Sequence, residues 1–424
     1  MIDKRVIEQV VQEQKLELEG YAQEEYCTRR EETLVDVDSK RAQVVVGVRR
    51  SGKSVLCYHV LRKHEKDFAY VNFDDERFLN LKAEELNDVL EVLYKEYGDF
   101  KYLFMDEAQN VEGWHLFVNR LLRQRIHVLI TGSNAKLLSG ELATHLTGRN
   151  DHIELFPLSF SEYCECKHVD TTSLTTKAEA FRRATYDEYL RQGGFPELLT
   201  ERSKRSYVTA LVREIIDKDL IKRFNIKNVR TFQQLSNHLM NVAPVVLNLK
   251  DLSEQFDLSS VTIGSYIEHL KQAYLLVGLQ KYSVKSRLRV RNEKVYPVDV
   301  ALMDGRVDAM AGANLGWRLE TQVFLELLRR NRPIGRDIFY FRERNGVEAD
   351  FVVCQDNHVI EIYQVCYDIS KESTLKREIR GLLTTSKATT CDNLFLITDH
   401  ARQTIMEGGK VIKVIPAYEW LCNH

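Results

Sequence analysis

The chain lacks an excess of charge of either sign. Its 424 residues carry 60 Lys and Arg against 62 Asp and Glu, a formal net charge of −2. A balance of this kind gives no overall electrostatic footprint for nucleic acid, so nucleic-acid binding would need a local basic patch. Hydrophobic residues make up 44% and charged residues 29%, which are ordinary values for a soluble globular protein. A chain of this length is expected to divide into roughly two to four domains, each with its own core.

The sequence also lacks an uninterrupted apolar run of membrane-spanning length. The N-terminal residues lead into Gln- and Glu-rich sequence and contain no apolar signal segment. The eight cysteines are scattered, a usage typical of a reducing compartment. We therefore expect a cytoplasmic protein that does not associate with membranes. Cys164, Cys166 and His168 are close in sequence, but without a second group of ligands nearby they do not predict a metal site.

What the sequence does contain is a complete phosphate-binding loop. Residues 47–54 fill every fixed position of the pattern G-x-x-x-x-G-K-[ST]. The β-branched run 42–46 before the loop predicts a buried parallel strand, and the apolar spacing of residues 55–61 after it predicts a helix. A strand, a glycine loop and a helix N-terminus in this order place an anion at the positive end of the helix.

The loop therefore predicts a binding site for ATP and Mg²⁺. Backbone N–H groups of the loop would surround the phosphates, and Lys53 would contact the β- and γ-phosphates. The Ser54 hydroxyl would hold Mg²⁺. The residues predicted to bind the nucleotide are Gly47, Arg49, Arg50, Ser51, Gly52, Lys53, Ser54 and Val55.

Two acids follow a second apolar strand, predicted over residues 101–105. In a phosphate-loop enzyme the first acid at the end of such a strand holds the metal, so Asp106 is predicted to bind Mg²⁺. Glu107 is then placed to act as general base on the attacking water. A lone strand could simply end in a solvated acidic turn, but the complete phosphate loop upstream favours a catalytic pair.

Three further polar residues are candidates for the same site. A third strand, predicted over residues 127–131, is followed by Ser133 and Asn134, which could orient the water or contact the γ-phosphate. They could also cap the helix that follows, and both roles remain open. Arg149 precedes a strand-like run at residues 153–156 and could stabilise transition-state charge, including from a neighbouring subunit. A surface arginine is the alternative.

The order of predicted elements divides the chain further. Residues 1–30 predict a helix on the outside of the core, with Arg29 and Arg30 either near the nucleotide or on the surface. Strands and helices alternate from about 31 to 155, which predicts a parallel sheet covered by helices, with the ligand at the carboxyl ends of the strands. From 157 to 240 the pattern is helical and predicts a lid or small bundle.

Residues 250–291 show a different order: a short helix, a turn, a second helix and a hairpin-like stretch. This is the order of a winged helix-turn-helix. The second helix contains Glu268 and few basic residues, so the segment could bind either DNA or a protein partner. The basic residues that fall where a wing would lie are Lys281, Lys285, Arg287, Arg289 and Arg291.

The C-terminal stretch of about 110 residues predicts another α/β unit. Glu320 lies on a predicted helix, and Asp350 and Glu361 lie on predicted strands. Carboxylates that converge from such elements could chelate a divalent ion for phosphodiester cleavage.

Taken together, these motifs resemble those of prokaryotic AAA-type P-loop ATPases that carry a winged-helix segment and a C-terminal restriction-endonuclease-like domain of unassigned function. The resemblance covers nearly the whole chain, although only the phosphate loop and the Asp-Glu pair are specific individually. Besides those two motifs, the residues that carry the resemblance are Thr131-Gly132-Ser133-Asn134, Thr147-Gly148-Arg149, Gly193-Gly194-Phe195-Pro196, Lys294-Val295-Tyr296-Pro297-Val298-Asp299, Leu319-Glu320 and Glu348-Ala349-Asp350-Phe351.

The resemblance implies an α/β fold in four parts. These are a P-loop NTPase core with an N-terminal helix at 1–156, a helical lid at 157–245, a winged-helix-like segment at 246–310 and an endonuclease-like domain at 311–424. Nucleases of that last fold usually carry Glu-x-Lys on the strand after the metal-binding Asp. Here Glu361 or Gln364 takes the acidic position and Tyr363 or Cys366 replaces the lysine, which favours a remnant of the fold over a working nuclease.

The resulting prediction is an ATP-binding, Mg²⁺-dependent ATPase of AAA type that couples its nucleotide state to its C-terminal domains. Two alternatives remain open: an ATP-gated DNA-binding protein or nuclease, and a scaffold that senses nucleotide without hydrolysing it. The expected ligands are ATP and ADP, and the expected partner is DNA or a protein bound through the winged-helix segment. A homo-oligomer is left open.

Overall fold

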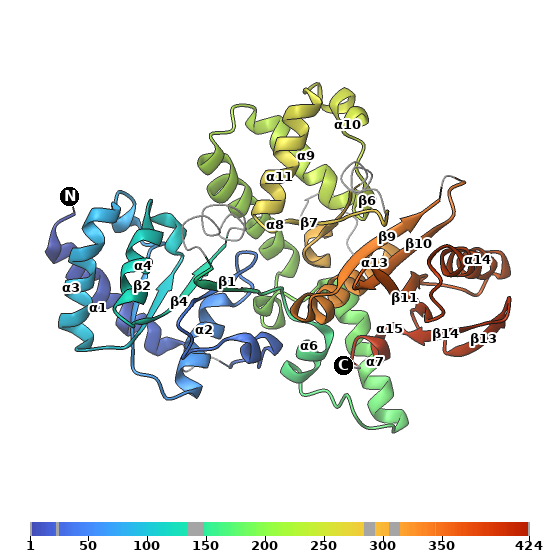
Figure 1. The fold of residues 1–424 in the computed structure, drawn as a ribbon, viewed down its shortest axis with the longest axis horizontal. Coiled ribbons are helices and arrows are strands. Elements are labelled where there is room, and N and C mark those ends of the chain that lie inside the picture. The colour runs from blue at the N-terminus through green and yellow to red at the C-terminus, as the bar shows by residue number, and fades with distance from the viewer. Residues whose placement is uncertain are drawn as a thin grey trace. The chain divides into compact units, whose positions relative to one another are not determined.

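The protein is described by a computed structural model that covers residues 2–22, 25–133, 148–283, 293–304, 314–343 and 345–422 (Figure 1). The chain forms two compact units. The first comprises residues 1–157 together with 272–274, and the second comprises residues 158–271 and 275–424. Within the residues described, no helix combines the length and apolar character that a bilayer crossing requires.

The first unit is built on a five-stranded sheet with the order β2-β3-β4-β1-β5. Every neighbouring pair is parallel, which confirms the parallel sheet predicted from the alternation of strands and helices. Strand β1, which lies between β4 and β5, is buried along its whole length, as its run of valines predicts. The strands are β1 (Ala42–Val46), β2 (Phe68–Asn72), β3 (Tyr102–Asp106), β4 (His127–Gly132) and β5 (Asn150–Glu154).

Helices of this unit pack against the sheet through apolar side chains. In α2, Leu56 and Val60 join the core formed with Val45 and Phe104. The predicted N-terminal helix is α1, and its Gln14 side chain donates to the Asn72 carbonyl at 2.8 Å, which ties α1 to the end of β2. The main helices are α1 (Lys4–Gly20), α2 (Lys53–Lys63), α3 (Leu86–Tyr97) and α4 (Trp114–Arg123).

The second unit begins with helices, as the sequence predicts. Helix α8 continues directly into a π-helical segment, Ile215–Lys222. The described helices of this region are α6 (Phe160–Cys166), α7 (Thr176–Gln192), α8 (Lys204–Glu214), α9 (Val229–Val242), α10 (Leu249–Phe256) and α11 (Ser260–Gln272).

A turn between α7 and α8 is held by a buried aspartate from a distant part of the chain. Asp299 Oδ2 accepts from the Gly194 backbone N–H at 2.9 Å. Gly193 has a φ of +80°, and a Cβ built there would lie 1.9 Å from Asp299 Oδ1, so this position excludes a side chain. Burial raises the pKa of Asp299 to about 6, against the backbone hydrogen bonds that lower it. The motif at residues 193–196 and the motif at residues 294–299 are thus packed against each other.

Helices α10 and α11 lie in the chain between β6 and β7, two strands of a three-stranded sheet with the order β6-β8-β7. Both pairs in this sheet are antiparallel. The strands are β6 (Val245–Val246), β7 (Leu276–Leu279) and β8 (Lys294–Pro297). Of the basic residues predicted at the wing, Lys281 forms an isolated bridge with Tyr340, and the others lie outside the described residues.

The C-terminal part contains a six-stranded mixed sheet with the order β13-β14-β12-β11-β10-β9. Its core includes Val352, Ile362, Leu382 and Leu396. The strands are β9 (Asp337–Arg342), β10 (Glu348–Gln355), β11 (His358–Val365), β12 (Leu394–Thr398), β13 (Gln403–Glu407) and β14 (Lys410–Pro416). The accompanying helices are α13 (Leu315–Asn331), α14 (Glu372–Thr389) and α15 (Ala417–Trp420).

Candidate functional site

The predicted phosphate loop connects β1 to the first turn of α2, as its sequence context indicates. Gly52 has a φ of 92° and Arg50 a φ of 68°, so the loop turns through two left-handed residues before the helix begins. Gly47 is required for another reason, because a Cβ there would lie 2.1 Å from the Leu155 carbonyl oxygen. Ser54 and Val55 follow in the first turn of α2. The loop backbone therefore lies at a helix N-terminus, a position that favours the binding of an anion.

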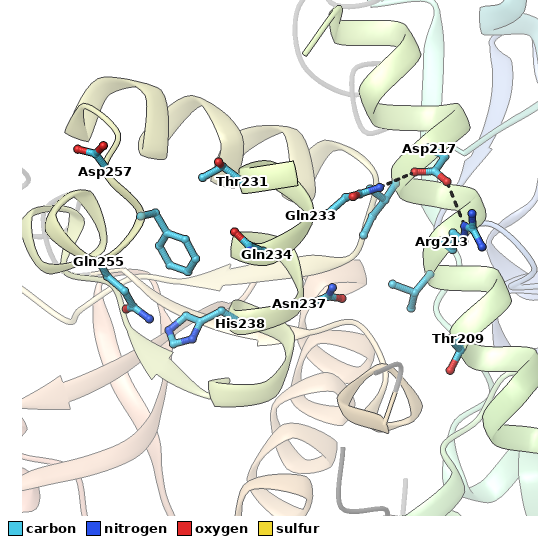
Figure 2. Close-up of a pocket in the computed structure, with 13 residues that line it drawn as sticks. Thr209, Arg213, Asp217, Thr231, Gln233, Gln234, Asn237, His238, Gln255 and Asp257 are labelled. Carbon is cyan, nitrogen blue, oxygen red and sulfur yellow. Dashed lines mark hydrogen bonds and ion pairs between the residues drawn. The ribbon is translucent and has the colours of Figure 1, made fainter. Parts of the chain in front are cut away.

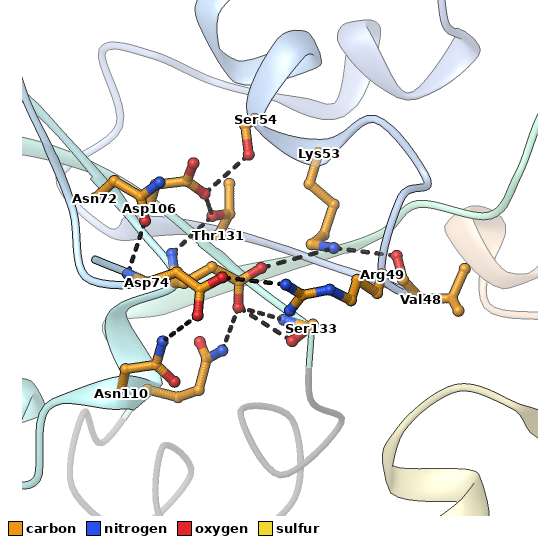
Figure 3. Close-up of polar contacts among 12 residues, drawn as sticks. Val48, Arg49, Lys53, Ser54, Asn72, Asp74, Asp106, Asn110, Thr131 and Ser133 are labelled. Carbon is orange, nitrogen blue, oxygen red and sulfur yellow. Dashed lines mark hydrogen bonds and ion pairs between the residues drawn. The ribbon is translucent and has the colours of Figure 1, made fainter. Parts of the chain in front are cut away.

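The Lys53 side chain is buried (Figure 3). Its ammonium lies between the Val48 carbonyl of the loop and Glu107, which directly follows β3. Its Nζ donates to the Val48 carbonyl oxygen at 3.1 Å and lies 4.0 Å from Glu107 Oε1. A buried ammonium needs such partners to offset its lost hydration. The predicted phosphate contact and the predicted general base are thus neighbours.

Asp106 lies at the carboxyl end of β3 and faces the loop (Figure 3). Ser54 Oγ donates to Asp106 Oδ1 at 2.9 Å, and the Thr131 hydroxyl donates to the same oxygen. Tyr70 donates to Asp106 Oδ2 at 3.3 Å. Burial and the adjacent charge of Glu107 raise the pKa of Asp106 to about 6, although these hydrogen bonds oppose the rise. The two residues predicted to hold the metal are therefore in direct contact.

Glu107 has a left-handed backbone (φ 50°), which turns its carboxylate away from the strand direction. Glu107 Oε2 accepts from the Ser133 backbone N–H at 3.2 Å and from Ser133 Oγ at 3.1 Å, and also from the Gln109 side chain. Burial acts to raise the pKa of Glu107, but the Lys53 charge and these hydrogen bonds outweigh it and lower the pKa. Glu107 is thus held ionised and oriented.

Of the two residues predicted after β4, Ser133 contacts Glu107 and Asn134 lies outside the described residues. Thr131 contacts Asp106 and was not predicted as a site residue, although it belongs to the resemblance motif at the end of β4, next to β3. Among the other loop residues, Arg49 pairs with Asp74 at 3.3 Å.

Arg149 is not brought to the phosphate loop of its own chain. It is exposed and precedes β5, where its carbonyl accepts from the Ala42 backbone N–H at the start of β1. Because β1 and β5 are parallel, Arg149 lies at the amino ends of the strands, roughly 16 Å of strand away from the loop. The role in its own site is therefore contradicted, and only the role in a neighbouring subunit remains from the prediction.

The sequence left open whether Arg29 lies near the nucleotide or on the surface. In the structure Arg29 is buried and contacts the phosphate loop. Its side chain is 4% exposed. The guanidinium donates to the Ser51 carbonyl oxygen at 3.0 Å and to the Phe156 carbonyl oxygen at 2.6 Å. It therefore holds the phosphate loop against the segment that follows β5.

Replacing Arg29 is expected to weaken nucleotide binding. Arg29→Met removes two hydrogen bonds from a charged donor, each contributing about 1.5–3 kcal/mol, and leaves both carbonyls without that donor. We expect ATP to bind about tenfold more weakly, with Arg29→Lys recovering part of the affinity because it keeps the charge but not the fork geometry. Titration with a fluorescent ATP analogue, well below each variant's unfolding temperature, measures this effect. Equal affinity of Arg29→Met and the parent would contradict it.

The residues present fit a nucleoside triphosphate with Mg²⁺. Ser54 and Asp106 supply the hydroxyl and carboxylate oxygens that Mg²⁺ prefers. Ser51 Oγ is buried and has no hydrogen-bond partner within the described part of the chain, so the loop retains an unused polar group. Lys53 supplies a cation beside them.

The raised pKa of Asp106 predicts a pH effect on stability without ligand. A carboxyl with a folded pKa of about 6 and an unfolded value near 3.8 stabilises the fold below about pH 4, and this contribution is lost as pH rises through 6. Asp106→Asn removes a cost of about 3 kcal/mol at pH 8 and little near pH 4. Urea unfolding without Mg²⁺ or nucleotide should therefore show the variant more stable than the parent at pH 8 only. The exposed Asp99→Asn serves as control, and a variant less stable at pH 8 would refute the assignment.

In the C-terminal part, two of the three carboxylates raised from the sequence lie near each other: burial and then the charge of Glu320 raise the pKa of Asp350 well above its usual value, and the nearby Lys294 charge opposes the rise. Glu320 Oε1 accepts from Lys294 Nζ at 2.6 Å and from the Tyr296 hydroxyl at 2.7 Å. Asp350 is also bound to β11, where its Oδ2 accepts from the Val365 backbone N–H at 2.8 Å. The neighbour of Asp350 is Gln364, whose Oε1 accepts from the Asp350 backbone N–H at 3.3 Å.

Glu361 accepts from the Tyr363 hydroxyl at 3.0 Å and lies apart from Asp350, so the three carboxylates that the sequence raised as a possible metal site do not form one group. The reason is strand alternation: Phe351 pairs with Tyr363, which places Asp350 beside Gln364 and puts Glu361 on the opposite face. Across the described ranges, no group of three or more His, Cys, Asp or Glu residues is placed to hold a metal.

Comparison with known families agrees with the loop geometry. Residues 39–164 match the family model of an AAA domain, and residues 183–311 match a domain of unknown function (DUF8612). The first match begins before β1 and ends after β5, so it covers the whole five-stranded sheet. Residues 39–164 are therefore similar to AAA domains.

At the level of the whole chain, it is 32% identical over 436 residues to "Uncharacterized protein MJ1544" of Methanocaldococcus jannaschii, covering 99% of this chain and 96% of the relative. The chain belongs to the same family as that protein. An uncharacterized protein of Haemophilus influenzae is 29% identical over 408 residues, covering 91% of this chain and 95% of the relative. Neither name states an activity.

Among solved structures, the Holliday junction branch migration motor RuvB of Thermotoga maritima is 16% identical, and the match covers 66% of this chain and 90% of that chain. The TM-score of 0.30 is too low to carry an argument.

Proposed function

We propose that the chain is a Mg²⁺-dependent ATPase whose active site comprises the phosphate loop, Asp106 and Glu107. One observation carries this proposal: a buried ammonium, a hydroxyl and two carboxylates gather at the carboxyl ends of β1 and β3. Ser54 Oγ lies 2.9 Å from Asp106 Oδ1, and Lys53 Nζ lies 4.0 Å from Glu107 Oε1. The AAA-domain match supports the same conclusion.

Each residue has a distinct role in the proposed reaction. Lys53 exchanges its contact with the Val48 carbonyl for oxygens of the β- and γ-phosphates. Ser54 and Asp106 hold Mg²⁺, which when bound offsets charge on the phosphates. Glu107, ionised in this environment, accepts a proton from the attacking water, and Ser133 keeps its carboxylate oriented.

Release of inorganic phosphate from ATP tests this function directly. We expect slow, Mg²⁺-dependent release that stops when the metal is chelated. Nucleotide binding without any release of phosphate would favour the second candidate, a scaffold that senses ATP but does not hydrolyse it.

We further propose that nucleotide state is coupled to three parts of the second unit: a helical lid at 157–245, a winged-helix-like segment at 246–310 and an endonuclease-like part at 311–424. The order α10, α11, β7, β8 supports the second of these. The order α13, β9, β10, β11, α14, β12 supports the third. A DNA or protein partner would bind the winged-helix part, and Arg149 would act only if subunits assemble into a homo-oligomer.

Nuclease activity is not expected from the C-terminal part. Glu320 is engaged by Lys294 and Tyr296, and Glu361 lies on the other strand face from Asp350. We expect no cleavage of plasmid or linear DNA with Mg²⁺ or Mn²⁺, with or without ATP, in the parent. Metal-dependent cutting that disappears in Asp350→Ala would overturn this expectation and restore the nuclease alternative.

A further inference from the structure

The second unit contains a pocket that the proposed ATPase reaction does not use (Figure 2). Its volume is about 910 Å³, in the upper part of the range of about 300–1,000 Å³ found for ligand pockets. Residues of α8, the π-helical segment, α9 and the end of α10 line it. All of them fall within residues 183–311, the stretch that matches the domain of unknown function.

Four of the side chains that line the pocket are carboxamides. Gln234, Asn237 and Gln255 make no side-chain hydrogen bond within the described part of the chain, whereas Gln233 donates to Asp217 Oδ1 at 3.0 Å. Each carboxamide can donate and accept, so three such groups match a ligand that offers donors and acceptors together. A peptide main chain has this property in every residue except proline.

The charges of the pocket disfavour an anion. Arg213 is the only lysine or arginine among the lining residues, and it already pairs with Asp217 at 3.5 Å. Asp257 is a second acid and is exposed. Apart from His238, the lining has one basic and two acidic side chains, a balance that does not suit the phosphates that dominate nucleic-acid affinity. A neutral or basic ligand fits this balance.

Apolar groups form the remaining surface. Val212 and Ile216 are each at most 3% exposed. The Phe256 ring packs against the His238 ring, with 5.5 Å between the ring centroids. These side chains offer contact to one apolar side chain of a ligand. The wall that carries Ile216 and Asp217 is π-helical, a rare geometry that occurs frequently at functional sites.

We propose that this pocket binds a short extended peptide segment of a partner protein, neutral or basic in composition and with an apolar side chain. The carboxamides pair with its main chain, the apolar wall receives its side chain, and Asp257 favours a basic residue nearby. The proposal stands independently of ATP hydrolysis, because none of the lining residues belongs to the phosphate-loop site.

The test uses the full chain and fluorescein-labelled heptapeptide pools that are capped at both ends. One pool contains neutral and basic residues, a second contains acidic residues at alternating positions, and a short oligo-dT strand is the third probe. We expect the neutral and basic pool to bind the parent, as measured by fluorescence anisotropy. We expect Asn237→Leu to bind it about tenfold more weakly, since one lost pair of hydrogen bonds corresponds to about that factor.

Arg230→Gln is the matched control, because Arg230 is exposed on α9 and lies outside the pocket; it should bind like the parent. If Asn237→Leu fails to fold, Gln255→Leu replaces it, since Gln255 is exposed. The proposal is overturned if no pool binds, if the acidic pool or oligo-dT binds preferentially, or if both pocket variants bind like the parent. Loss of ATPase activity would leave this result unaffected.

Discussion

Lys53→Ala is expected to abolish tight binding of ATP. The Lys53 ammonium is buried at the loop and can reach phosphate oxygens by leaving the Val48 carbonyl, 3.1 Å away. Losing a charge-assisted contact of this kind costs roughly 3 kcal/mol, so affinity should fall at least about 100-fold. Equilibrium titration with a fluorescent ATP analogue in Mg²⁺ buffer measures the change.

Lys101→Ala is the matched control, because Lys101 is exposed and precedes β3, at the far end of that strand from Asp106. It should bind ATP like the parent. Equal loss of affinity in both variants would point to general destabilisation, and unchanged affinity in Lys53→Ala would remove the phosphate contact from the account.

Glu107→Gln is expected to separate binding from hydrolysis. The amide keeps the shape of the side chain and can still accept from Ser133, but it cannot take a proton from water. General-base catalysis typically contributes about 100- to 10,000-fold, so the rate of phosphate release should fall by about that factor. ATP affinity should stay close to that of the parent.

The exposed Glu112→Gln, a few residues further along the chain, serves as control and should hydrolyse ATP at the parent rate. Parent-like turnover by Glu107→Gln would show that another group activates the water. Loss of both binding and turnover would show instead that Glu107 acts mainly through its neighbour Lys53, 4.0 Å away.

The parts of this site that sequence could predict are those in which residue type and local order act together. The glycine loop needs Gly47 and Gly52 for space and left-handed backbone, and these needs are written into a contiguous pattern. Asp106 and Glu107 end an apolar strand, and parallel strands end at one edge of the sheet. Contact between Ser54 and Asp106 follows from that topology.

What sequence could not predict depends on contacts between distant residues. Arg29 reaches carbonyls of residues 51 and 156, and a backbone acceptor leaves no trace in residue type. The hydrogen bond from the Gly194 backbone N–H to Asp299 likewise joins a side chain to the backbone of a distant residue, so it could not be predicted either. The sequence left open whether Glu361 or Gln364 lies beside Asp350, because strand register decides which face a side chain takes, and register is not visible in a single sequence.

The most direct test of the account is isothermal titration calorimetry of the purified parent chain with ATP and with ADP in Mg²⁺ buffer. The account predicts saturable binding of both nucleotides, near one per chain, that is lost in Lys53→Ala. A folded parent that releases no binding heat and shows no affinity for either nucleotide would contradict it.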